Sequence, residues 1–94
     1  MLTDSVQREA LSAVLMLVAA GFRLFTVGDP EAPDELVYVR PKAGGRDMVR
    51  VYGPAECEGV RMVHGKLVRQ THGTAMEVVH EVLGWSDLII ARFT

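Results

Sequence analysis

The chain has little of several features that define whole classes of protein. Among its 94 residues there is one cysteine, Cys57, so an intrachain disulfide is excluded. Aromatic residues make up 6% of the sequence, and 10 basic against 12 acidic side chains leave a formal net charge of −2. Because binding to nucleic acid depends on a basic surface, this balance disfavours a nucleic-acid partner.

Long hydrophobic runs are also lacking. The longest, residues 10–22, is broken only by Ser12 and is shorter than the roughly 20 residues that span a bilayer, so no membrane partner is expected. The first residues have neither the basic start nor the cleavage site of a secretory signal, which favours a cytoplasmic location. Hydrophobic residues nevertheless make up 49% of the chain. We therefore expect a single α+β domain over residues 1–94 that buries surplus apolar surface in a homodimer.

The apolar run belongs to a helix predicted over about residues 5–20. Asp4 and Gln7 have the spacing of a capping box, and Gly21 before Phe22 is typical of a Schellman ending. A helical wheel places the large residues on one arc, which we expect to face the core: Val6, Ala10, Leu11, Val14, Leu15, Leu17 and Val18. The other side carries a heptad-like seam of mostly small residues, the candidate oligomer interface: Ser5, Glu9, Ser12, Met16 and Ala19.

Alternating apolar and polar residues predict strands at 22–27, 35–40, 47–52 and 88–93. Residues 28–34, with two prolines and three acids, are expected to form a loop, and Gly44-Gly45 predicts a hairpin connection. Residues 55–69 have two interpretations. They form either one helical turn followed by a tight hairpin around His64-Gly65, or a single helix.

A second helix is predicted from Thr74, which forms a capping box with Glu77, to about Leu83. Trp85 follows this helix and is expected to pack beneath it. The element order α-β-β-β-β-β-α-β, with short connections, predicts a mainly antiparallel sheet of five to six strands with two helices on one face.

Most arginines fall in the predicted strands, whereas most acidic residues fall in loops and helices. Period-two alternation places arginine and tyrosine opposite valine, which predicts an aliphatic side for the helices and an outward Arg/Tyr face. Guanidinium groups suit phosphates and carboxylates, and tyrosines supply rigid contact area. The candidate ligand-binding residues are Arg23, Tyr38, Arg40, Arg50, Tyr52, Arg61 and Arg69. The alternative is an open sheet face covered by long, soluble side chains.

No catalytic motif is recognised, since Gly-x-Ser-x-Gly, Gly-x-Gly-x-x-Gly and Walker A patterns are all missing. Glu77 and His80 have a Glu-x-x-His spacing, but a metal site needs ligands from further elements, so neither a metal nor a cofactor is predicted. Glutamates on both sides of Cys57 should raise its thiol pKa and oppose nucleophilic chemistry. Enzymatic activity is thus left open, with a non-enzyme favoured.

Three functional hypotheses follow from the sequence. The first is a small interaction module that works as a homodimer, with a protein as a further partner. The second is a binding site for an anionic small molecule, in a cleft lined by Tyr38, Tyr52, Trp85 and arginines. A small enzyme would be a special case of it, with His64 or His72 as acid or base. The third and weakest is nucleic-acid binding through the Arg/Tyr face.

Overall fold

The computed structural model describes residues 2–29 and 31–85. The elements follow in the order α1 (Leu2–Ala19), β1 (Arg23–Asp29), β2 (Ala32–Lys42), β3 (Gly45–Gly53), β4 (Glu56–Val63), β5 (Lys66–Gly73) and α2 (Ala75–Leu83). The strands neighbour one another in chain order and every pair is antiparallel. The predicted α+β class is confirmed. The strand predicted at 88–93 lies outside the described residues.

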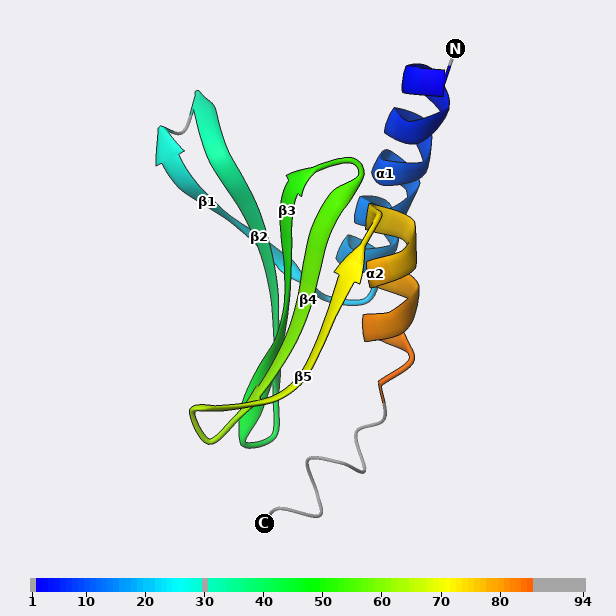
Figure 1. Ribbon diagram of the computed structural model, residues 1–94. Coiled ribbons are helices and arrows are strands. Elements are labelled where there is room, and N and C mark those ends of the chain that lie inside the picture. Colours follow the sequence, from blue (N-terminus) through cyan, green and yellow to red (C-terminus); the bar gives the residue numbers. More distant parts are fainter. Residues whose placement is uncertain (1, 30, 86–94) are drawn as a thin grey trace.

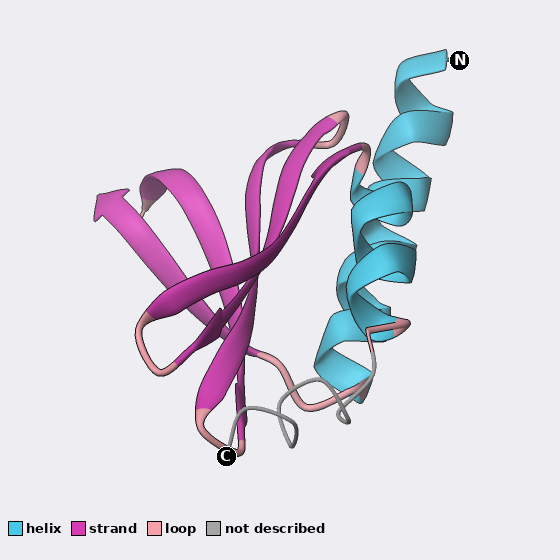
Figure 2. Cartoon of the chain, turned by 60° about the horizontal axis from the view of Figure 1, so that its bottom comes forward, coloured by secondary structure: helices cyan, strands magenta, loops and turns pink. Residues whose placement is uncertain are grey.

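Both helices lie on the same side of the twisted sheet (Figure 1, Figure 2). The shorter helix, α2, packs on β3, β4 and β5, whereas α1 packs mainly on α2 and touches the sheet less. The core between these layers includes Leu17 of α1, Val49 of β3, and Val78 and Val82 of α2. Among the described residues, no helix is long and apolar enough to cross a membrane.

The end of α1 has the predicted Schellman geometry. Gly21 has a φ of +93°, and its N–H donates to the carbonyl of Val18 while the N–H of Phe22 donates to that of Leu17 at 3.0 Å. Phe22 and Leu17 are both buried in the core. The start of the helix was predicted wrongly, because α1 begins at Leu2 and so includes Asp4 within its first turn.

The second helix matches its prediction. The Thr74 hydroxyl accepts a hydrogen bond from the Glu77 N–H, and the Glu77 carboxylate accepts one from the Thr74 N–H, which completes the capping box. The hydrogen bond from the Thr74 N–H, followed by a smaller effect of the Thr74 side chain, lowers the pKa of the Glu77 carboxyl. Trp85 is 6% exposed and packs with the core, as expected.

Residues 55–69 form strands, so the helix alternative is wrong. The hairpin turns at His64 and Gly65, which have φ values of +50° and +78° and give the two-residue turn that suits twisted strands. The helical turn predicted at 55–59 is also wrong, because β4 begins at Glu56. Likewise, the loop expected over 28–34 is largely strand, since β1 continues to Asp29 and β2 starts at Ala32. Strand pairing overrides the local helix signal in the first segment and the local loop signals in the second.

Candidate interaction surface

The strand register divides the predicted Arg/Tyr set between the two sides of the sheet. Tyr38 pairs with Val49, and Val49 pairs with Gly59, whose Cα faces Val78 and Val82 of α2. Tyr38, Arg40 and Arg61 therefore lie on the helix side, and Arg69, paired with Arg61, lies there too. The outer side carries Arg23, Arg50 and Tyr52. The prediction of one outward Arg/Tyr face is wrong.

A local signal for this register was present in the sequence. The β2–β3 connection is a two-residue turn at Ala43 and Gly44, with Lys42 opposite Gly45. Counting back from such a turn brings Tyr38 opposite Val49, so tyrosine and valine share one side. The alternation within each strand was correct, but the relative phase of β2 and β3 was not.

Arg61 is buried in an ion pair under the helices. Its Nε lies 2.7 Å from Asp47 Oδ1, its Nη2 lies 3.0 Å from Oδ2, and both side chains are fully buried. The same guanidinium donates to the Trp85 carbonyl and lies 5.6 Å from the Trp85 ring centroid. Because this side chain joins β3, β4 and the segment that follows α2, its role is to hold the second helix to the sheet.

Arg40 ties the end of α1 to the same carboxylate. Its Nη2 lies 3.5 Å from Asp47 Oδ2, its Nη1 donates to the Ala20 carbonyl, and its guanidinium stacks on the Phe22 ring at 4.7 Å. A cation beside the last carbonyls of a helix also stabilises the helix dipole. Arg40, like Arg61, therefore stabilises the packing of a helix on the sheet.

The outer side of the sheet carries a row of paired charges. Arg50 Nε lies 3.3 Å from Glu35, and Arg50 Nη1 lies 3.9 Å from Glu58. The same Glu58 carboxylate lies 2.9 Å from His72 Nε2 and accepts a hydrogen bond from Gln70. These contacts are internal to one sheet face, so Arg50 already has two carboxylate partners before any ligand is considered.

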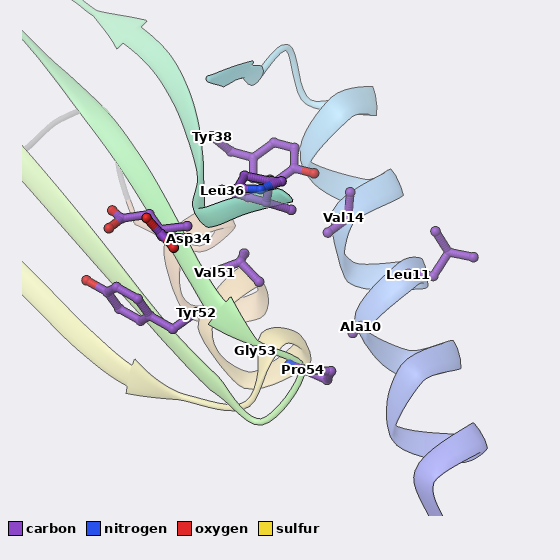
Figure 3. Close-up of a pocket in the computed structure, with 12 residues that line it drawn as sticks. Ala10, Leu11, Val14, Asp34, Leu36, Tyr38, Val51, Tyr52, Gly53 and Pro54 are labelled. Carbon is purple, nitrogen blue, oxygen red and sulfur yellow. The ribbon is translucent and has the colours of Figure 1, made fainter. Parts of the chain in front are cut away.

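The helix side has an open groove between α1 and the neighbouring ends of β2 and β3. Its volume is about 460 Å³, and Figure 3 shows Val14 directed across it toward the sheet residues. The lining is mainly apolar: Ala10, Leu11, Val14, Pro33, Asp34, Glu35, Leu36, Tyr38, Val51, Tyr52, Gly53 and Pro54. We call this the α1–sheet groove. Of the predicted cleft, Tyr38 points toward α1, whereas the ring of Tyr52 points away from it (Figure 3). Trp85 and the arginines are not part of the lining.

The exposed side of α1 continues from this groove. Leu11, Leu15 and Val18 are 61%, 59% and 54% exposed, and their spacing places them on one stripe of the helix. Leu11 also lines the groove and points away from the sheet (Figure 3). We call these three residues the α1 stripe.

The prediction that the large-residue arc of α1 faces the core is wrong for the α1 stripe and for Val6, which is also exposed. The buried positions are Ala13 and Leu17, with Ala10, Val14, Met16 and Ala20 partly buried. These residues belong to, or pack against, the core that α1 shares with α2 and the sheet. Because both arcs of the helix are apolar, the periodicity alone could not decide which one the rest of the chain covers.

The predicted small-residue seam lies at the surface. Ser5, Glu9, Ser12 and Ala19 are exposed, and Met16 is half-buried beside the core. Its role as an oligomer interface stays a prediction, and the α1 stripe is the more apolar of the two surfaces.

Two further groups that could take part in chemistry, Cys57 and Tyr38, are buried. Cys57 is buried and donates to the Gly53 carbonyl at 3.4 Å. Burial, with a smaller effect from Glu56, raises the pKa of its thiol to about 11, so the sequence-based direction is confirmed but desolvation is the main cause. Burial likewise raises the pKa of Tyr38. Within residues 2–29 and 31–85, no group of three or more His, Cys, Asp or Glu side chains is placed to hold a metal ion.

Comparisons with protein-family models, with curated proteins and with solved structures found no match to this chain. The functional argument therefore rests on the geometry described above.

Proposed function

We propose that the protein is an interaction module that works as a homodimer, joined through the α1 stripe and the α1–sheet groove. The observation that carries this proposal is the exposure of Leu11, Leu15 and Val18 beside an open apolar recess. Scattered surface leucines are ordinary, but a stripe that continues into a groove is typical of an interaction site.

A second copy of the chain is the partner that fits this surface best. A two-fold interface buries the same patch on both subunits, so the patch must carry both a ridge and a recess. The α1 stripe supplies the ridge and the groove supplies the recess. Fully burying a Leu or Val side chain contributes roughly 1.5–3 kcal/mol, or about 1 kcal/mol for a side chain that is half-buried already. Six such side chains offset the lower end of the about 4–15 kcal/mol that association costs, and the groove walls add to them.

The proposal is tested by sedimentation with matched variants of α1. The protein should sediment at about twice its chain mass of 10.3 kDa. Leu15→Glu should yield folded monomer, because the interface would have to desolvate a carboxylate. Ser12→Arg, on the small-residue seam of the same helix, should leave the dimer unchanged. A monomer at every concentration would overturn the proposal, and dissociation by Ser12→Arg alone would move the interface to the seam.

A small-molecule site is the second candidate, favoured by the volume of the groove and by Tyr38 in its lining. The lining is mainly apolar, so an apolar neutral ligand fits the groove better than an anion. Nile red, a neutral apolar dye, should gain fluorescence with the wild type. Ala10→Trp, which fills the groove, should abolish the gain, and Ser12→Trp should retain it. Equal fluorescence with both variants would remove the groove as the site.

The anionic-ligand and nucleic-acid hypotheses stay predictions. Arg40, Arg50 and Arg61 each have a carboxylate partner within the chain. An incoming phosphate would compete with these contacts, which is why the geometry supports an apolar partner more strongly.

A further inference from the structure

Among the described residues, the first strand, β1, forms one edge of the sheet and pairs with a strand on one side only. It runs for seven residues, Arg23–Asp29, pairs with β2, and is exposed along its whole length. Its exposed side chains include Leu24, Phe25 and Val27. An edge strand of this kind presents unpaired backbone donors and acceptors to another strand, and proteins usually protect such edges with charge, proline or a covering element.

The opposite edge, β5, has that protection. Its exposed residues are mainly polar, among them Lys66, Arg69, Gln70 and His72, and α2 packs against it. The apolar residues of β1 therefore mark it as the edge that is left available for pairing.

The charges of β1 identify its partner as a second β1. Arg23 opens the strand and Asp29 closes it. Resting on the proposed homodimer, we infer that two β1 strands pair antiparallel about Thr26, which sets Arg23 opposite the partner's Asp29 and Phe25 opposite the partner's Val27. Each β1 strand thus supplies one cation and one anion, so the two strands form two identical ion pairs, as a two-fold interface requires.

The pairing of β1 with β2 is regular from Arg23 to Val27 and continues to Asp29 after one irregularity. That irregularity lies between Val27 and Gly28, where Gly28 has a φ of +94° and β2 carries an extra residue, Asp34. The Asp29 carboxylate accepts a hydrogen bond from the Glu31 N–H through Oδ1. Arg23 has no ion pair with another described residue, so both ends of the strand can take an intermolecular partner.

The paired sheet is continuous with the proposed interface. Antiparallel strands in one sheet are related by a two-fold axis perpendicular to it, so the helices of both subunits lie on the same side of a ten-stranded sheet. Leu24 pairs with Tyr38, which lines the α1–sheet groove. The apolar surface thus extends from the groove across β1 to the partner subunit.

A charge exchange tests the register. Arg23→Glu and Asp29→Lys should each weaken dimerisation about tenfold, because like charges then face each other at two symmetric positions. The double variant should return the dissociation constant to within about threefold of wild type, because the two ion pairs are restored with reversed sign. Arg69→Glu on the other edge strand should leave the constant unchanged. Single and double variants of equal affinity would overturn the register.

Cross-linking gives a second measurement that does not depend on charge. Thr26→Cys should join two subunits through a short bis-maleimide, since Thr26 lies on the two-fold axis. Gln70→Cys, on β5, is the matched control and should not cross-link. The native Cys57 does not compete, because it is buried. A stable dimer without cross-linking at position 26 would overturn β1 pairing but leave the homodimer standing, whereas a monomer throughout would overturn both.

Discussion

Replacing Asp47 by asparagine should be among the most destabilising single changes in the chain. The carboxylate and its partner Arg61 are both fully buried, and Arg40 shares the same carboxylate at 3.5 Å. Asparagine keeps the size of the side chain but leaves two guanidinium groups facing a neutral amide. Breaking a buried ion pair in this way costs about 3–5 kcal/mol.

A loss of this size is a large part of the total free energy of unfolding. A chain of 94 residues has a free energy of unfolding of roughly 5–14 kcal/mol. With a urea m-value of roughly 1–3 kcal/mol/M, the unfolding midpoint should fall by more than about 1 M while m stays constant. The comparison is made by urea denaturation at one fixed protein concentration, because dimerisation makes the midpoint depend on concentration.

Arg50→Gln is the matched control. Arg50 also contacts two carboxylates, but its side chain is 44% exposed, so its loss should cost less than about 1 kcal/mol. The double variant Asp47→Leu/Arg61→Met should recover part of the stability lost in Asp47→Asn, because no unpaired charge remains from that pair. An equal loss of unfolding free energy in Asp47→Asn and Arg50→Gln would refute the argument that burial makes the Asp47 ion pair more important.

Three further outcomes are expected. Gly59→Ala should lose about 1–3 kcal/mol in urea denaturation, since its Cβ would lie 2.4 Å from Val82 Cγ2; an unchanged midpoint would mean that α2 packs less closely on β4. Thr74→Ala should cost about 1 kcal/mol by removing the N-cap, and Thr74→Ser should restore most of it. Folding raises the pKa of the Cys57 thiol, so the protonated thiol contributes to the free energy of unfolding. This contribution is fully present below the ordinary pKa of 9.0 and is lost as the pH rises toward about 11. Melting temperatures over this range should fall more steeply for the wild type than for Cys57→Ala.

Local signals were enough to predict both ends of α2, the end of α1 and the period of the strands. Thr74 and Glu77 cap α2 through contacts three residues apart, and Gly21 ends α1 through hydrogen bonds within one turn. Such contacts depend on neighbouring residues alone, so the sequence pattern contains all the information they need.

The candidate site depended on contacts between distant segments. The pairing of Tyr38 with Val49 placed a tyrosine and the arginine at position 40 under the helices. The preference of α1 for α2 left Leu11 and Leu15 exposed, although their spacing is typical of a core-facing arc. The buried face of a helix or strand cannot be predicted from that segment alone when both of its faces are apolar enough to be buried. The buried face then depends on which other segment packs against it.

The mass of the protein in solution tests the central claim most directly. Sedimentation equilibrium over about 1 to 100 micromolar should show a reversible monomer–dimer equilibrium governed by mass action, with the dimer dominant at the upper end. The same series with Leu15→Glu should stay at the 10.3 kDa of one chain. A wild-type protein that stays monomeric over this range, or a Leu15→Glu variant that dimerises as the wild type does, would contradict the account.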